Sequence, residues 1–331
     1  MTTQEKAEYA LGHINETRDR LLGEIRKGII GQDEVINELL ITILARGHCL
    51  LTGIPGLGKT LLVKTISKCL SLDFKRIQFT PDLMPADVVG SEVVDEDPST
   101  GRKSFRFAPG PIFSNIVLAD EINRTPPKTQ AALLEAMEER QVTVSGQTRE
   151  LDAPFFVLAT QNPIELEGTY PLPEAQLDRF LLNPVIQYLS QEDEIRMVGE
   201  TTGVDRVIPQ PVLSGDDIQV LQSLTRQLPV PETVVSYAVR LTAASRPDVD
   251  ACDEWTSKRV RWGAGSRGAQ ALILAAKAKA LLDGRTNASS EDVKALAKSA
   301  LRHRILPSFF AESEGLGSDE IIDHMLETVA V

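Results

Sequence analysis

The sequence predicts an α/β protein with a doubly wound parallel sheet of five strands, followed by a small all-helical domain. Three observations predict this fold class. Strand and helix patterns alternate through the first 187 residues, which is typical of a parallel sheet covered by helices. Several apolar runs end in glycine-rich or polar segments, where such sheets bind ligands. The composition shifts near residues 188–190, and helical patterns follow. We therefore expect an α/β domain over 1–188 and a helical domain over 189–331, whose final helix begins near Ser318.

Local patterns predict the elements of the first domain. Apolar positions at helical spacing indicate a leading helix over 3–28, and a second helix runs from Asp33 to Arg46. Thr125 is expected to cap the helix that Pro126 opens, because threonine is a favoured cap and proline suits the first turn. The remaining expected elements are strands at 49–52, 76–79, 115–119, 155–160 and from 180, and helices at 60–70 and 174–179.

Two segments interrupt the alternation. Residues 80–110 hold four prolines and an acidic run, and we expect a hairpin there with strands near 91–95 and 102–107. An excursion of about thirty residues inside a compact domain is either a functional insertion or a sign of misassignment. A second hairpin is expected over 141–153.

Composition limits the class of protein. The chain has 331 residues, 42% hydrophobic and 25% charged, with a net charge of −12. This acidic balance argues against a broad nucleic-acid surface. The three cysteines lack metal-ligand spacing and are expected to be reduced. The N-terminus lacks a basic and apolar leader, and no apolar run approaches a membrane span. We expect a cytoplasmic protein without membrane insertion.

The most informative stretch is a phosphate-loop pattern between an apolar strand and a helix. A glycine-rich turn lets successive backbone N–H groups surround an anion, and the following helix adds its positive end. Lys59 is expected to reach the β- and γ-phosphates, and the Thr60 hydroxyl to bind Mg²⁺. We expect ATP to contact the whole loop and the residue after it, which are Gly53, Ile54, Pro55, Gly56, Leu57, Gly58, Lys59, Thr60 and Leu61.

Two further strands end in polar residues that suit phosphate chemistry. Asp120 follows the third strand and is expected to hold Mg²⁺ through water, while Glu121 polarises the attacking water. Asn162, after the fourth strand, can hydrogen-bond the γ-phosphate and the water. The alternatives are that the acidic pair caps the next helix and that Asn162 is a turn residue. Since these segments end at one sheet edge, we expect one crevice.

Two arginines are candidates for stabilising transition-state charge. Arg179 precedes the fifth strand, so it lies far from its own site and could enter that of a neighbouring copy. The alternative is a salt bridge to Asp178 or Glu174. Arg267 begins a long apolar helix and could reach the γ-phosphate if the helical domain folds over the site. Its alternative is a solvated helix start.

With these residues in view, the chain resembles the MoxR family of AAA+ ATPases, in the clade with a helix-2 insert. The resemblance covers about residues 10–310. Segments 80–110 and 141–153 are similar to the helix-2 insert and the pre-sensor-1 hairpin. The carrying motifs are Ile30-Gly31-Gln32 before the nucleotide site, Gly53–Thr60 as Walker A, Asp120-Glu121-Ile122-Asn123-Arg124 as Walker B, Thr160–Pro163 as sensor 1, Pro171–Phe180 around the arginine finger Arg179, and Arg267 as sensor 2.

The resemblance implies a hexameric, chaperone-like ATPase that uses ATP and Mg²⁺. Such proteins act with von Willebrand factor A-domain partners to mature client complexes or insert metal into them. Ile30, Gly31 and Gln32 are then expected to contact the nucleotide, as is Arg267. Around sensor 2 the family pattern is similar to Gly-Ala-Ser-Pro-Arg-Ala, whereas this chain has Gly263-Ala264-Gly265-Ser266-Arg267-Gly268. The missing proline and the extra glycines are expected to loosen this segment.

Three other functions remain open from the sequence. One is the ATPase subunit of a magnesium-chelatase-like complex, which shares the insert and the hairpin. Another is a nucleotide-gated scaffold that binds ATP with negligible hydrolysis. A nucleic-acid motor is disfavoured by the negative charge.

Overall fold

The computed structural model of the protein describes residues 3–54, 56–96, 103–161, 168–203 and 208–331. Its centre is a parallel sheet in the order β1 (Cys49–Thr52), β8 (Phe156–Gln161), β5 (Ile116–Asp120) and β2 (Phe74–Gln78). The predicted fifth strand lies beside β1, where Leu182 and Val185 form parallel bridges with Cys49 and Thr52. The prediction of a five-stranded parallel sheet is therefore confirmed, with a short and irregular fifth strand.

Alternating side chains of the central strands enter two different apolar layers. Ile116 and Leu118 of β5 pack into a core shared with α1 (Thr3–Arg26), α2 (Asp33–Leu44) and α3 (Lys59–Cys69). Val117 and Ala119 enter a second core together with Leu133 and Leu134 of α5 (Pro127–Glu139). Because neighbouring residues of a strand point to opposite faces, a fully apolar strand must be covered on both sides.

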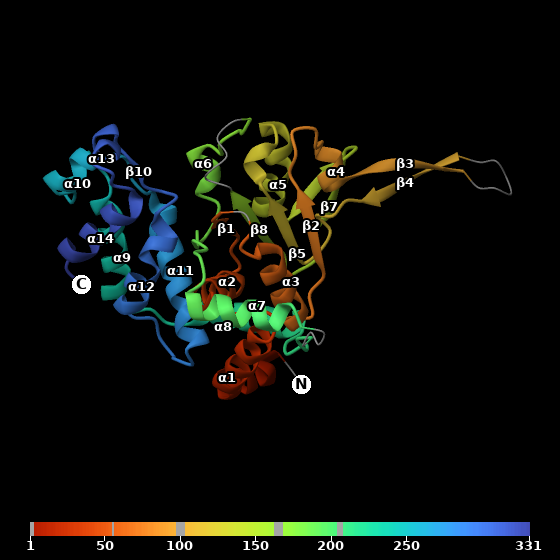
Figure 1. Ribbon diagram of the computed structural model, residues 1–331, viewed down its shortest axis with the longest axis horizontal. Coiled ribbons are helices and arrows are strands. Elements are labelled where there is room, and N and C mark those ends of the chain that lie inside the picture. The colour runs from red at the N-terminus through yellow and green to blue at the C-terminus, as the bar shows by residue number, and fades with distance from the viewer. Residues whose placement is uncertain (1–2, 55, 97–102, 162–167, 204–207) are drawn as a thin grey trace.

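A helical bundle lies beside the sheet and packs on α2 (Figure 1). Its central helix α11 (Ser266–Leu282) contacts α2 and three helices of the bundle. A two-stranded ribbon also occurs here, so this part is not helical throughout. The bundle consists of α8 (Gly215–Gln227), α9 (Glu232–Ala244), α10 (Glu254–Arg259), α11, α12 (Ser290–Leu301), α13 (Phe309–Ser313) and α14 (Ser318–Thr328), with β9 (Val260–Trp262) and β10 (Leu306–Pro307) as the ribbon.

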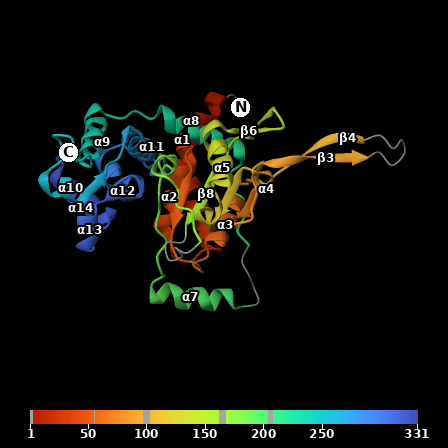
Figure 2. The ribbon, with the colours of Figure 1, turned by 90° about the horizontal axis from the view of Figure 1, so that it is seen from above.

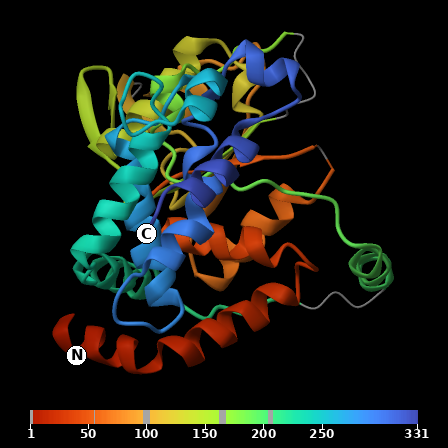
Figure 3. The ribbon, with the colours of Figure 1, turned by 90° about the vertical axis from the view of Figure 1, so that its left-hand side faces the viewer.

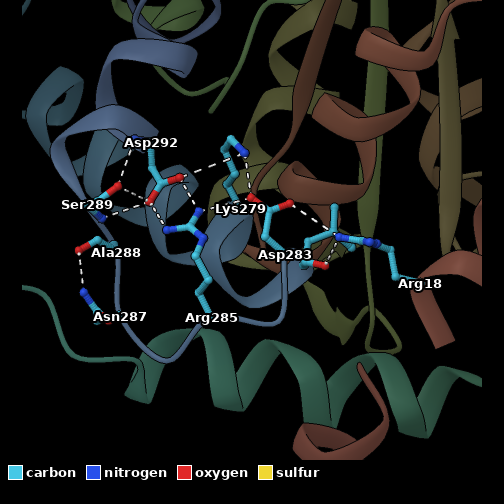
Figure 4. Close-up of polar contacts among 9 residues, drawn as sticks. Arg18, Lys279, Asp283, Arg285, Asn287, Ala288, Ser289 and Asp292 are labelled. Carbon is cyan, nitrogen blue, oxygen red and sulfur yellow. Dashed lines mark hydrogen bonds and ion pairs between the residues drawn. The ribbon is translucent and has the colours of Figure 1, made fainter. Parts of the chain in front are cut away.

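A polar network joins the N-terminal helix to this bundle (Figure 4). The buried Asp292 of α12 accepts from the Arg285 guanidinium, with 2.8 Å between Arg285 Nη1 and Asp292 Oδ2, and also caps α12 together with Ser289. Asp283 pairs with Lys279 at 2.7 Å and with Arg18 of α1 at 3.7 Å. The turn between α11 and α12 is therefore fixed from both sides, and α1 is attached to it.

The insertion and both hairpins form as expected. The insertion contains α4 (Pro85–Val89), which the sequence did not predict, and an antiparallel hairpin of β3 (Gly90–Glu96) and β4 (Lys103–Pro109). This hairpin projects away from the body of the molecule (Figure 1). The second hairpin pairs β6 (Gln141–Val144) with β7 (Gln147–Glu150).

One predicted helix cap is wrong. The helix after the acidic pair begins at Pro127, with Pro126 as its N-cap residue, and Thr125 does not cap it. The Thr125 hydroxyl instead donates to the Thr80 carbonyl, 2.7 Å away, and is fully buried. A long-range contact therefore takes this side chain away from the local role for which threonine is suited.

Candidate nucleotide-binding site

The phosphate loop connects β1 to α3 as predicted. Gly56 and Gly58 have φ angles of 87° and 76°, a region that glycine enters without steric cost. Lys59 is the first residue of α3, and its ammonium group donates to the Gly53 carbonyl. The amino end of α3 and its first-turn N–H groups thus face the loop, as an anion site requires. Pro55 lies outside the described residues.

The acidic pair follows β5 at the same edge of the sheet. Asp120 Oδ1 accepts from the Thr160 hydroxyl of β8 at 2.6 Å, and Asp120 Oδ2 accepts from Arg76 of β2 at 2.7 Å. Neighbouring strands on both sides therefore orient this carboxylate. Since both of its oxygens have donors, its position is fixed by the sheet.

Glu121 is held in a turn directly after the strand. Its φ is 57°, and its backbone N–H donates to the Thr160 hydroxyl oxygen at 2.8 Å. Its carboxylate accepts from the Gln78 amide at 2.9 Å and from Arg124 at 3.0 Å. A non-glycine residue in this backbone region is uncommon, and here it stands where the chain leaves β5 for the 3₁₀ turn at Ile122–Arg124.

The charge of Lys59 interacts with both residues of the acidic pair. Burial lowers the pKa of Lys59, while the charges of Asp120 and Glu121 act in the opposite direction. Lys59 donates to Gly53 just after β1, and the acidic pair stands at the end of β5, which runs parallel to β1 in the same sheet, so the three groups lie at one edge of the sheet. Three of the predicted groups therefore converge, and Thr60 follows directly in the first turn of α3. Asn162 lies outside the described residues, just after the end of β8.

A second part of the site lies beside the loop. After the bridge at Val185 the chain reaches Ile186, whose side chain and carbonyl lie close to Gly53. Gln32 donates to the Gln187 carbonyl at 2.6 Å, and both residues line a polar cavity of about 400 Å³. Gly31 has a φ of 68°, and a Cβ there would lie 2.7 Å from Leu189. The segment at residues 30–32 is thus packed against the residues that follow the fifth strand.

The two candidate arginines share one carboxylate. Arg179 Nη2 lies 2.7 Å from Glu138 Oε2, and Arg267 Nη2 lies 3.1 Å from Glu138 Oε1. The cavity that all three line also includes Gly47 and His48, which precede β1. The phosphate loop follows the opposite end of the same strand, so these arginines lie at the edge of the sheet away from it.

The location of Arg267 differs from the expectation that it approaches its own phosphate loop. α11 begins at Ser266 even without a proline, with Arg267 in its first turn. A Cβ at Gly268 would lie 3.1 Å from Ala264 and 3.2 Å from Leu301. The glycine that departs from the family pattern therefore permits close packing of α11 on α12.

Sequence reasoning missed the residues that orient the acidic pair and the arginines. Arg76 and Gln78 lie on β2, and the sequence does not show that β2 neighbours β5. The sequence indicates Thr160 only as part of a motif, but in the structure its buried hydroxyl donates to Asp120 and orients that carboxylate. Glu138 is one of several acidic residues on α5, and only the packing of α11 distinguishes it.

Comparisons with known proteins identify the family. The "ATPase family associated with various cellular activities (AAA)" matches residues 48–182, and an "AAA lid domain" matches residues 252–325. Chaperone MoxR1 of Mycobacterium tuberculosis is 39% identical over 95% of this chain and 82% of its own length. Protein MoxR of Paracoccus denitrificans is 32% identical over 92% of this chain and 93% of its own. A crystal structure of a candidate ATPase from Cytophaga hutchinsonii superposes with a TM-score of 0.88 at 39% identity, covering 99% of this chain and 97% of that one. The chain belongs to the MoxR family of AAA+ ATPases.

Proposed function

We propose that this chain is an ATP-hydrolysing chaperone of the MoxR type that works as a ring of six copies and remodels or matures partner protein complexes. The proposal is supported by the relatives named MoxR and by the convergence of Lys59, Asp120 and Glu121. We also propose two functional parts, an α/β part over 1–188 and a lid over 189–331. The two family models, at 48–182 and 252–325, are consistent with this division.

The residues of the site fit ATP with Mg²⁺. The loop N–H groups and Lys59 would bind the phosphates, and the Thr60 hydroxyl and Asp120 would hold the metal, since Mg²⁺ is usually held by one or two carboxylates plus phosphate oxygens. Bound Mg²⁺–ATP supplies the phosphoryl group and neutralises its charge. Glu121 accepts a proton from water at its carboxylate. Gln78 and Arg124 both donate to Glu121 Oε2, so Oε1 can accept this proton while the two contacts hold the carboxylate in place. Asn162 is proposed to orient the water.

Both arginines are proposed to act on the site of a neighbouring copy. The main support for this proposal is that Arg179 and Arg267 share Glu138 at the edge of the sheet opposite the phosphate loop. A guanidinium at this edge can serve a triphosphate only across an interface between copies. Glu138 would neutralise both arginines until a γ-phosphate competes for them.

Mixing two inactive variants tests this arrangement. Lys59→Ala should lose nucleotide binding but keep its arginines, and Arg179→Ala should keep its phosphate loop but lose the arginine that the neighbour needs. Each variant alone should hydrolyse ATP at least about 100-fold more slowly than the wild type, because an arginine finger typically contributes 10³–10⁵. Their mixture should regain a clear fraction of the activity in a phosphate-release assay. A mixture as inactive as its components, while still co-assembling, would show that Arg179 acts within its own chain.

The partners are proposed from the family resemblance. We infer a von Willebrand factor A-domain protein and a client complex, with metal insertion as one form of maturation. Glu121→Gln should bind ATP without turnover, so partners that prefer the ATP state should remain bound to it during a pull-down. Recovery of a tetrapyrrole-binding subunit instead would indicate a magnesium-chelatase-like ATPase. ATP-dependent partner binding by a wild type that shows no phosphate release would indicate a scaffold.

A further inference from the structure

Three arginines outside the proposed mechanism converge on one cavity. Arg46 follows α2, Arg140 follows α5, and Arg226 lies in the last turn of α8. All three line a cavity of about 260 Å³, which we call the arginine pocket. They come from distant parts of the sequence, so the fold brings them together.

None of these three arginines forms an ion pair with any part of the chain that the structure describes. The other arginines of the cavity do: Arg179 and Arg267 bind Glu138, and Arg304 binds Asp178. Among the described residues, Arg46 donates to the Gln222 side chain at 3.1 Å and Arg140 donates to the Arg46 carbonyl at 3.2 Å. Burial lowers the pKa of Arg140, and the charges of Arg46 and Arg226 lower it further.

Each arginine lies near a helix C-terminus, which favours one cation. That effect does not explain why three arginines without an ion pair among the described residues meet in one cavity of a chain whose net charge is −12. The two carboxylates that line the cavity, Glu138 and Asp178, are already bound to Arg179, Arg267 and Arg304. Repulsion within such a cluster is relieved when an acidic group binds it. The arginine pocket therefore matches an acidic partner surface.

Helix α7 (Gln191–Thr201) is such a surface on the same chain. None of its residues is buried, and it stands apart from the rest of the molecule (Figures 2 and 3). An isolated helix of this length is marginal in water, so packing must stabilise it. Helical spacing places Ile195 and Val198 together, with exposed fractions of 67% and 49%. Glu192 and Glu194 flank this apolar strip and form no ion pair with the residues described.

We propose that α7 of one copy docks in the arginine pocket of the next copy. Glu192 and Glu194 face Arg140 and Arg226, while Ile195 and Val198 cover the apolar Ala271 and Leu274 that line the same cavity. Helix α7 and the face formed by α8 and α11 lie on opposite sides of the molecule (Figure 2), so the contact is head-to-tail and can close into a ring. The inference rests on the ring assembly proposed above and names surfaces that hold it together.

Charge reversal with rescue tests the docking. The variants are E192R/E194R on α7, R140E/R226E in the arginine pocket, and the four changes combined. Assembly is measured by analytical ultracentrifugation with Mg²⁺ and a non-hydrolysable ATP analogue. We expect each double reversal to weaken assembly at least tenfold and the combined variant to recover to within about threefold of the wild type, since complementary pairs couple non-additively. The matched control, E254R/K258E, reverses an exposed ion pair on α10 and should assemble normally.

The outcomes separate this inference from the proposed function. Binding of a fluorescent ATP analogue and circular dichroism show that each variant folds and retains its nucleotide site. If the wild type assembles and the double reversals assemble equally well, the docking is wrong and the ring stands. The same holds if the combined variant assembles no more strongly than either double reversal. If R140E/R226E assembles normally but no longer binds inorganic phosphate, the pocket holds a small anion and the docking is wrong. If the wild type does not assemble at all, both proposals fail.

Discussion

At the scale of single residues, a buried histidine makes stability depend on pH. His48 is buried, with 5% of its surface exposed: its Nδ1 accepts from the Val157 N–H at 3.0 Å, and its Nε2 lies 3.0 Å from the Met137 carbonyl. Burial lowers its pKa from 6.5 to about 4. The unfolded chain therefore binds a proton more readily than the folded chain between these values, and stability falls as pH decreases from about 6.5 to 4.

This loss can be measured and assigned. Two and a half pH units at 1.36 kcal/mol each give about 3 kcal/mol from His48 over the whole range, of which about 2 kcal/mol is lost between pH 7 and pH 5. Burial also lowers the pKa of His303, so His303 adds to the same loss. Urea unfolding at pH 7 and at pH 5 should show a smaller decrease for His48→Gln than for the wild type, and an unchanged decrease for the exposed control His13→Gln. Equal decreases in His48→Gln and the wild type would contradict the assignment to His48.

The site residues that directly follow a strand could be predicted from the sequence. Those whose role depends on a tertiary contact could not. Lys59, Asp120 and Glu121 each stand directly after an apolar strand, so their convergence could be inferred from a parallel sheet alone. Arg76 and Gln78 could not be assigned, because their role depends on β2 lying beside β5. Glu138 joins Arg179 to Arg267 only because the fold brings the side chain of Arg267, in the first turn of α11, to a residue of α5, and periodicity does not reveal that contact.

At the scale of elements, a polar chain connects the end of β1 with the helical bundle. The Thr52 hydroxyl donates to Asn183 Oδ1 at 2.9 Å, just before the phosphate loop. The Asn183 N–H donates to the Ser299 carbonyl of α12 at 2.6 Å, and its carbonyl accepts from Arg302 at 2.7 Å. Arg302 in turn binds Asp319 of α14 through two contacts of 2.8 Å. The strand that carries the loop is therefore fixed by helices from the other end of the chain.

A double-mutant cycle tests this connection. Asn183→Ala and Thr52→Val should each cost about 1–2 kcal/mol of stability, because each leaves one polar atom without its partner. The double variant should be less destabilised than the sum by about 0.5–1.5 kcal/mol. Chemical unfolding provides the measurement, and Thr52→Val combined with Asp319→Asn, which does not remove a direct partner of Thr52, is the comparison. Strict additivity of the first pair would show that the hydrogen bond contributes nothing.

Helices and strands were predicted correctly where the local sequence pattern determines the structure. Predictions failed where a residue distant in the sequence makes the deciding contact. The strands of the sheet and both hairpins have the expected positions because apolar runs and turn residues define them. The cap at Thr125 failed because the Thr80 carbonyl takes its hydroxyl. Helix α7 was expected within a packed helical domain, yet none of its residues is buried. Its apolar strip predicts a helix, but periodicity does not say whether the surface that covers it belongs to the same copy.

At the scale of the whole molecule, one buried guanidinium joins the bundle to the sheet. The Arg304 side chain is 3% exposed and lies just beyond α12. Its Nε donates to Asp178 at 2.6 Å, and its other nitrogens donate to the carbonyls of Asp178, Phe180, Leu181 and Ala300. Burial lowers its pKa, and the Asp178 carboxylate opposes that effect. Asp178 immediately precedes Arg179, so the same contact positions the proposed arginine finger.

Replacing Arg304 should therefore affect stability and the neighbouring site together. Arg304→Met leaves Asp178 and several carbonyls without their donor, and we expect it to cost about 3–5 kcal/mol, as for other broken buried pairs. Arg304→Lys keeps the charge but cannot span these acceptors, so it should be less destabilised. Arg304→Lys should still bind ATP. Mixed with an excess of Lys59→Ala it should hydrolyse ATP as the wild type does in that mixture, because its own phosphate loop is intact and the Lys59→Ala neighbour supplies Arg179. Mixed with Arg179→Ala, it should rescue less than the wild type, because it presents a displaced Arg179. The matched control is Arg240→Lys, whose exposed side chain donates to Ser236 Oγ and to the Ala330 carbonyl. Equal rescue by Arg304→Lys and Arg240→Lys would show that Arg304 stabilises the fold without positioning the arginine finger.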